Sequence, residues 1–349
     1  MNERERSYAE ALREAVDQEM ERDASVVCFG LDVDDPKAIQ GTTRGLAEKH
    51  GPGRVFGTPL AEDAMTGVAI GMALAGLRPV HVHIRMDFLL LAMNQLVNIA
   101  AKASYMYGGQ VHVPLVVRAM IGKSWGQGAQ HSQGLYPFFM HVPGLRVAAP
   151  SNPHDAKGCL IAAIREDDPV LLVEHRLLYP HQGPVPEVPY LVPPGRARIV
   201  AAGRDVTLVG ISHALIDCLR ARHYLEAAGV SAEVIDPIWL APLDAETIVT
   251  SVARTGRLLV VDNGWTTCGA GAEIVARVVE RLQGERGVAV RRLGFAATPC
   301  PPTPSLEQLY YPDPRTIATV AFDLVEGRAT GWRPDERPDT LETPFRGPF

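Results

Sequence analysis

The stretch FGTPLAEDAMTGVAIGMALAGLRPVHVHI, residues 56–84, contains the patterns of a turn, a helix and a strand in direct succession. Glu62 falls in the first turn of the expected helix. Small residues follow at intervals of four, namely Gly67, Gly71 and Ala75. This spacing makes a flat stripe on which another helix can pack closely. The run at residues 78–84 has the length and apolar character of a buried strand. The stretch therefore predicts a helix that packs beside a buried strand.

Similar apolar runs recur on both sides of this stretch, each bounded by glycine, proline or charge. They lie at residues 26–33, 113–120, 169–175, 205–211 and 256–263. Helical patterns alternate with them, for example at 214–228 and 271–282. Strands that are apolar on both faces are typical of parallel sheets covered by helices. The sequence therefore predicts an α/β protein.

Length and one proline-rich segment predict two domains. A chain of 349 residues is too long for one ordinary core. The segment YPHQGPVPEVPYLVPPG, residues 179–195, contains six prolines. We expect this density to exclude regular structure and to favour an extended, semi-rigid linker. The prediction is a first domain over 1–178, a second over 196–330, and a proline-rich tail over 331–349.

Composition restricts the classes of partner and the compartment. A formal net charge of −6 gives no reason to expect a nucleic acid or a membrane surface as partner. No stretch reaches the length of a membrane span, and the charged N-terminus lacks the apolar core of a signal peptide. The five cysteines are widely spaced without a CxxC pair, which indicates a reducing cytoplasm and argues against a zinc or disulfide framework. We therefore expect a cytoplasmic protein that binds small molecules or other proteins.

Several residues are candidates for chemistry, and each has a structural alternative. Glu62 is either an acid favoured by the helix dipole or a partly desolvated carboxyl whose raised pKa lets it share a proton with a heterocycle. His131, in GAQHSQ, is an acid or base, a metal ligand or a core residue. His81 and His83 alternate as metal ligands can, but no third ligand has a recognisable spacing to them. Phe88 is either core or a stacking platform.

Known phosphate-binding motifs are missing from the sequence. It contains no GxGxxG after a strand, no GxxxxGK[ST], and no GDG followed by an asparagine that would hold a metal diphosphate. If this chain helps to bind a phosphorylated cofactor, another chain must therefore hold the phosphates.

Most of the chain resembles one family, the β subunits of the thiamine-diphosphate-dependent decarboxylating component of 2-oxo acid dehydrogenases. These are of pyruvate, branched-chain or acetoin type and are related to the transketolases. The segments that carry the resemblance lie at 57–80, 86–102, 105–118, 128–133, 141–158 and 162–179. Residues 206–244 and 256–274 resemble the transketolase-type C-terminal domain. The resemblance implies a parallel-sheet pyrimidine-binding domain followed by a C-terminal α/β domain.

The resemblance also implies roles for individual residues. Glu62 matches the glutamate that hydrogen-bonds N1′ of the aminopyrimidine, which leads to the cofactor ylid and, after decarboxylation, to the enamine. Phe88 matches the aromatic residue packed on the pyrimidine, and Leu60 an apolar neighbour of that ring. His131 matches a histidine expected to meet the substrate carbonyl or carboxylate and to assist the reaction with the acceptor.

Partners and metals follow from the same resemblance. It implies an α subunit that holds Mg²⁺ and the diphosphate, in a heterotetramer of two α and two β chains, so that this chain alone would be inactive. A small 2-oxo acid is the implied substrate, and a lipoyl acyltransferase core is a further implied partner. A structural potassium site is matched by the backbone carbonyls of Leu115, Ala163, Ile164, Glu166 and Asp168.

Four positions depart from the family pattern. Leu31, in GLDV, stands where the family usually has a glutamate. Arg85 replaces a small or apolar residue, and Lys123 and Trp125 lie in a loop that is glycine-rich in the family. These changes are either drift in surface loops or parts of a pocket for an anionic or sugar-like acceptor.

Three functional hypotheses remain. The first is oxidative decarboxylation of a 2-oxo acid with acyl transfer to a lipoyl acceptor. The second is an acyloin- or ketol-forming transferase of two subunits that acts on an aldehyde, a ketone or a sugar. The third is a non-catalytic binding scaffold, against which Glu62, Phe88 and His131 together argue.

Overall fold

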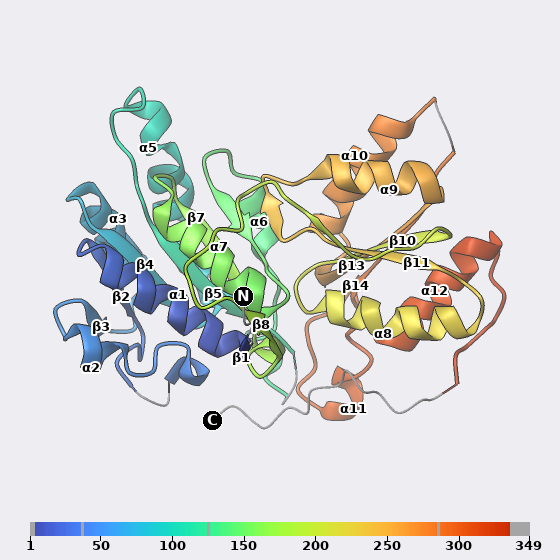
Figure 1. The fold of residues 1–349 in the computed structure, drawn as a ribbon, viewed down its shortest axis with the longest axis horizontal. Coiled ribbons are helices and arrows are strands. Elements are labelled where there is room, and N and C mark those ends of the chain that lie inside the picture. The colour runs from blue at the N-terminus through green and yellow to red at the C-terminus, as the bar shows by residue number, and fades with distance from the viewer. Residues whose placement is uncertain (1–3, 36–37, 124–125, 285–286, 336–349) are drawn as a thin grey trace. The chain divides into compact units, whose positions relative to one another are not determined.

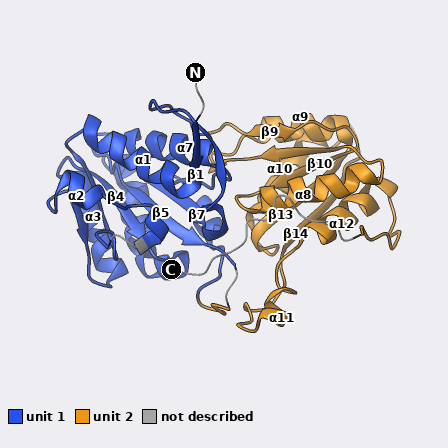
Figure 2. Cartoon of the chain, turned by 60° about the horizontal axis from the view of Figure 1, so that its bottom comes forward, with its two compact units in different colours: residues 1–125, 131–194, 345–349 blue, residues 126–130, 195–344 orange. Residues whose placement is uncertain are grey.

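The computed structural model describes residues 4–35, 38–123, 126–284 and 287–335, which fold into two compact units (Figures 1 and 2). Among the described residues, unit 1 contains those up to 123 together with 131–194. Unit 2 contains 126–130 and the described residues from 195 onward. A short segment that precedes His131 in the chain therefore belongs to unit 2.

Unit 1 is built on parallel strands in the spatial order β6-β7-β5-β4-β2-β3. Their bounds are β2 Val26–Gly30, β3 Val55–Gly57, β4 Arg78–His83, β5 Val116–Ile121, β6 Arg146–Ala148 and β7 Val170–His175. Every residue of β2, β5 and β7 is buried, as expected for strands covered on both faces. The predicted parallel α/β architecture is confirmed.

Helices α1 (Tyr8–Arg22) and α7 (Pro153–Arg165) of unit 1 pack against each other (Figure 1). A capping box starts α1: Ser7 Oγ accepts a hydrogen bond from the Glu10 amide, and the Glu10 carboxylate accepts one from the Ser7 amide. The other helices of unit 1 are α2 Leu46–His50, α3 Glu62–Leu74, α4 Met86–Leu89, α5 Ala101–Met106 and α6 Tyr136–Met140, with the shorter or irregular helices η1 Ala38–Gly41, η2 Leu90–Ala92, η3 Asn94–Ala100 and η4 Arg176–Leu178.

Part of the proline-rich segment forms a strand, so the prediction of a linker without regular structure is wrong there. Strand β8 (Gln182–Val185) pairs antiparallel with β1 (Arg4–Ser7), in a register that sets Pro184 opposite Glu5. The described residues place no third strand in this small sheet. Proline is compatible with a strand that has a free edge, because the N–H that proline lacks is not needed on that side.

Lys157 fixes the chain just beyond β8. Its side chain is fully buried, and its ammonium group donates to the carbonyl oxygens of Pro186 (2.7 Å) and Glu187 (3.0 Å). The same ammonium forms an ion pair with Glu14 at 2.5 Å. A buried lysine is tolerated when its charge and its donors are all satisfied, so these contacts hold residues 186 and 187, which we expected to belong to an extended, semi-rigid linker.

Unit 2 is a second α/β layer structure, with strand order β14-β13-β10-β11-β9. Strand β9 is antiparallel to its neighbour β11, and the other pairs are parallel. The bounds are β9 Arg198–Ala201, β10 Val206–Gly210, β11 Ala232–Asp236, β13 Arg257–Trp265 and β14 Ala289–Phe295, with a short strand β12 Trp239–Ala241. The helices are α8 Ala214–Ala227, α9 Ala245–Thr255, α10 Ala270–Leu282, α11 Pro304–Glu307 and α12 Pro314–Glu326. The predicted strands and helices of this half of the chain are confirmed.

The five cysteines, all among the described residues, are free. Cys268 is exposed, and the other four are buried: Cys28, Cys159, Cys218 and Cys300. Burial raises the pKa of the Cys28 thiol to about 11. Within the described part of the chain, no helix is both long enough and apolar enough to cross a bilayer.

Candidate active site

The predicted site residues of unit 1 follow the carboxyl ends of its parallel strands. Leu31 comes directly after β2, Glu62 begins α3 beyond β3, Phe88 lies in α4 beyond β4, and Lys123 follows β5. Because parallel strands point the same way, the loops after them gather at one edge of the sheet. This edge is the usual ligand-binding position in open α/β sheets.

A pocket at this edge surrounds Glu62. Its lining consists of Leu31, Thr58, Pro59, Leu60, Ala61, Glu62, Met65, His81, Val82, His83 and Ile84. Glu62 is half-buried at the first position of α3, where the unpaired N–H groups of a helix stabilise negative charge. Leu31 and Leu60 give the pocket apolar walls. One carboxyl group in a mostly apolar lining fits a flat heterocycle that carries a basic ring nitrogen, such as the aminopyrimidine of thiamine diphosphate.

His81 and His83 line this pocket, although their spacing suggested only a metal site. The His81 ring stacks on Phe29 with centroids 4.6 Å apart, and the His83 ring meets His81 edge-on at 4.4 Å. Nε2 of His83 lies 3.2 Å from Oγ1 of Thr66 in α3. Their alternation on β4 could have predicted that both side chains line the same pocket, because residues two apart on a strand share a face.

Burial keeps both histidines uncharged at neutral pH. It lowers the pKa of His81 to about 4, and that of His83 well below its ordinary value. Across the described residues, no cluster of three or more His, Cys, Asp or Glu side chains could hold a metal ion. Both imidazoles are thus neutral in this pocket, and that of His83 lies within hydrogen-bond distance of Thr66.

Phe88 and His131 form a second cluster at the same sheet edge. Their rings meet edge-on, with centroids 5.4 Å apart and an interplanar angle of 78°. Both side chains are half-buried. The structure thus brings together two residues that stand far apart in the sequence. Sequence reasoning missed Asp87 and Arg176, which contact the chain around His131.

Two other residues that were predicted to shape a substrate pocket, Arg85 and Lys123, lie outside the lining of the pocket around Glu62. Arg85 is half-buried just before α4, and burial lowers the pKa of its guanidinium group while the charge of Asp87 opposes this. Lys123 is half-buried after β5, and Trp125 lies outside the described residues. Neither Arg85 nor Lys123 lines the pocket beside Glu62. Their proposed role in acceptor binding stays a prediction.

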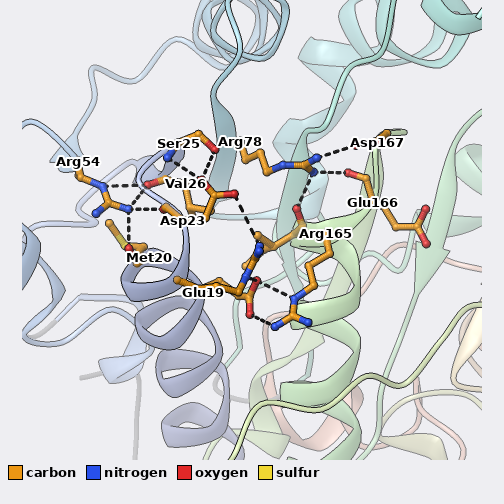
Figure 3. Close-up of polar contacts among 12 residues, drawn as sticks. Glu19, Met20, Asp23, Ser25, Val26, Arg54, Arg78, Arg165, Glu166 and Asp167 are labelled. Carbon is orange, nitrogen blue, oxygen red and sulfur yellow. Dashed lines mark hydrogen bonds and ion pairs between the residues drawn. The ribbon is translucent and has the colours of Figure 1, made fainter.

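Two of the five carbonyl groups assigned to potassium contact the guanidinium cation of Arg78. The five groups belong to Leu115, Ala163, Ile164, Glu166 and Asp168. Nη1 of Arg78 donates to the carbonyl oxygens of Ile164 (3.0 Å) and Glu166 (2.8 Å), and Nη2 donates to Oδ1 of Asp167 at 2.6 Å (Figure 3). The guanidinium charge opposes a second cation at these oxygens. These residues therefore do not fit an open potassium site.

Comparisons with known proteins agree with the two-unit fold. The transketolase pyrimidine-binding domain family matches residues 4–182, and the transketolase C-terminal domain family matches residues 195–317. The β subunit of acetoin:2,6-dichlorophenolindophenol oxidoreductase from Cupriavidus necator is 42% identical, over 91% of this chain and 96% of that subunit. The β subunit of the pyruvate dehydrogenase E1 component from Porphyra purpurea is 40% identical, over 92% of this chain and 97% of its own length.

A solved structure described as a split-gene transketolase, an inactive β4 tetramer, superimposes with a TM-score of 0.71. The match covers 92% of this chain and 98% of that one, at 21% sequence identity. At this identity the likeness concerns the fold alone.

Proposed function

Since the chain belongs to the transketolase-related family of β subunits of pyruvate and acetoin dehydrogenases, we propose that it supplies the pyrimidine-binding half of a decarboxylating active site. It is the β subunit of a thiamine-diphosphate-dependent 2-oxo acid dehydrogenase. The observation that carries the proposed site is the position of Glu62, a half-buried carboxylate at the N-terminus of α3 in an apolar-walled pocket.

Glu62 and its neighbours prepare the cofactor pocket. Thiamine diphosphate, when bound, supplies a carbon nucleophile for the 2-oxo group and accepts the electron pair left by the departing CO₂. Glu62 would share a proton with N1′ of the aminopyrimidine. Leu31 and Leu60 line the pocket beside this contact. Phe88 would pack on the pyrimidine.

His131 serves the later half of the reaction in this proposal. Its imidazole lies against Phe88, and an imidazole can bind a carbonyl or carboxylate oxygen and exchange a proton with it. We propose a lipoyl group on an acyltransferase as the acyl acceptor. Transfer to an aldehyde, a ketone or a sugar is the alternative, and it uses the same residues with a different acceptor.

An α subunit completes the site. The sequence of this chain contains no motif for a metal diphosphate, so we assign Mg²⁺ and the diphosphate group to the partner. Two α and two β chains form the proposed assembly. Potassium has no part in it, because Arg78 bonds to two of the carbonyl groups that would hold the ion. A cytoplasmic location stays a prediction.

The test is release of CO₂ from a panel of 2-oxo acids by the purified chain, by a candidate α subunit and by the co-purified pair, with and without thiamine diphosphate and Mg²⁺. We expect release only from the pair with both cofactors. Adding a lipoyl domain or an aldehyde to the active pair then identifies the acceptor. A well-assembled pair that releases no CO₂ from any substrate contradicts the proposal.

A further inference from the structure

The guanidinium group of Arg176 joins the two ends of the loop that leads to His131. Arg176 begins η4, directly after β7, and is 5% exposed. Its Nη2 donates to the carbonyl oxygen of Gly122 at 2.7 Å and to that of His131 at 3.1 Å. Gly122 is the first residue after β5. One nitrogen atom therefore ties the start of this loop to its end.

Gly122 makes this close approach possible. Its φ is +144°, a value that residues with a side chain rarely adopt. A Cβ atom built there would lie 3.2 Å from Cβ, the backbone nitrogen and Nε of Arg176. Such a contact would push the arginine outward. The glycine thus provides the space in which the guanidinium reaches both carbonyl oxygens.

A second anchor holds the chain on the other side of His131. Oδ1 of Asp87 accepts hydrogen bonds from the backbone amide of Gln133 (3.2 Å) and from its side-chain Nε2 (2.9 Å). Asp87 is 7% exposed and precedes Phe88, whose ring meets the His131 imidazole. Buried hydrogen bonds of this kind define a single arrangement of the atoms that they join.

We propose that Arg176 is a positioning residue that sets the place of the His131 imidazole at the active site. It acts through the backbone: Arg176 holds the His131 carbonyl group from η4, while Asp87 holds Gln133 from α4. The inference rests on the proposed function of His131. Catalytic groups must be held within about 0.5 Å of their productive position, and a shift of about 1 Å can cost roughly 100-fold in rate.

The kinetic test compares Arg176→Met with Arg176→Lys in the assembled pair. Methionine fills similar space without donors, so we expect kcat to fall about 10- to 100-fold, with a smaller change in KM for the 2-oxo acid. A lysine ammonium can donate to both carbonyl oxygens from one nitrogen, as Nη2 does. We therefore expect Arg176→Lys to regain most of the lost kcat.

The matched control is Arg78→Met, because Arg78 also donates from one nitrogen to two backbone carbonyl groups of unit 1 (Figure 3). Its partners, Ile164 and Glu166, lie at the end of α7. We expect this variant to lose thermal stability while its kcat, corrected for folded protein, stays near that of the wild type. A general effect of losing an arginine that bonds to the main chain would lower kcat in both variants.

Amide hydrogen exchange of residues 128–133, measured on the same proteins, tests the clamp without any reaction. We expect faster exchange in Arg176→Met than in the wild type or in Arg78→Met. Unchanged exchange, or a wild-type kcat despite faster exchange, overturns the positioning role. If the wild-type pair turns over no 2-oxo acid, the proposed function fails. Faster exchange in Arg176→Met then still supports the clamp, and unchanged exchange still refutes it.

Discussion

The imidazole of His131 lies edge-on to the phenyl ring of Phe88, with ring centroids 5.4 Å apart. This arrangement sets the positive edge of one ring against the negative face of the other, which stabilises aromatic pairs by about 0.5–1.5 kcal/mol beyond burial. Phe88 therefore has two functions in our proposal: it orients His131 and it packs on the cofactor pyrimidine.

Replacing Phe88 by leucine tests the cofactor contact. Leucine keeps apolar volume but removes the aromatic face, so we expect thiamine diphosphate to bind the assembled pair about 3- to 10-fold more weakly, as for a loss of about 1 kcal/mol. Titration of the cofactor, followed by intrinsic fluorescence, measures this. Phe138→Leu, at a ring that is 53% exposed in α6, is the control and should bind as the wild type does. Equal affinity in both variants would contradict the assignment of Phe88.

Glu62→Gln separates a catalytic carboxyl from a carboxyl that only stabilises a helix. Glutamine keeps the shape but cannot share a proton as the carboxylate does, so we expect turnover by the pair to fall at least about 100-fold, with assembly intact. Asp63→Asn is the matched control, because Asp63 is an exposed acid in the same first turn of α3. If Glu62 only complements the helix dipole, the two variants should both keep full activity.

The buried histidine His81 predicts a loss of stability in acid. Its pKa is about 4 in the folded chain against an ordinary value of 6.5, so the unfolded chain binds the proton first as pH falls. The contribution of His81 to stability is thus complete above about pH 6.5 and is lost as pH falls toward 4, by at most about 3 kcal/mol.

His81→Phe checks this prediction, since phenylalanine can keep the stack on Phe29 and cannot take up a proton. Thermal midpoints measured from neutral pH down to about pH 4.5 should fall less steeply in this variant than in the wild type. His83, which also has a lowered pKa, would account for part of the slope that remains. The exposed His141, changed to phenylalanine, should leave the wild-type slope. Identical slopes in all three proteins would show that His81 is not a source of the acid sensitivity.

A buried ion pair between neighbouring strands of unit 1 gives a further prediction about the stability of the fold. Nε of Arg118 in β5 lies 2.5 Å from Oε1 of Glu174 in β7, and both side chains are fully buried. Nη2 of Arg118 donates a second hydrogen bond to this carboxylate at 3.0 Å, and Tyr179 donates a third at 2.9 Å. Removing one charge of such a pair leaves the other uncompensated, so we expect Glu174→Gln to cost about 3–5 kcal/mol.

Chemical denaturation measures the free energy of unfolding of Glu174→Gln and of a control variant, Glu273→Gln. Glu273 pairs with Arg277 on α10, where both side chains are about half exposed, and such pairs contribute about 0.5 kcal/mol or less. A loss in Glu174→Gln no larger than in Glu273→Gln would mean that water or a rearranged neighbour compensates the buried guanidinium.

The sheets were predictable because strands buried on both faces leave uninterrupted apolar runs. Residues 26–33 and 169–175 indicated β2 and β7 for this reason. Strand β8 was not predictable in this way. Its prolines argue against a strand, and its pairing with β1 depends on a partner from the other end of unit 1.

The candidate site could be predicted only in part. Glu62 and Phe88 lie in helices that follow strands β3 and β4; their pattern left a structural alternative open, and the family resemblance favoured a role in chemistry. Arg176 left no comparable signal, because its partners are the backbone carbonyl groups of Gly122 and His131. Two of the partners of Arg78 are likewise main-chain carbonyl groups. A contact to the main chain constrains the identity of only one side chain, so it leaves no complementary pair of residue types in the sequence.

Cys268 is the exposed thiol among five free cysteines, and it lies in the turn before α10. The other four side chains are buried, and burial raises the thiol pKa of Cys28 and Cys218 further from the reactive range. A maleimide fluorophore would therefore attach to the native protein at one place in unit 2. Fluorescence anisotropy of that label would follow the arrival of the α subunit without any engineered cysteine.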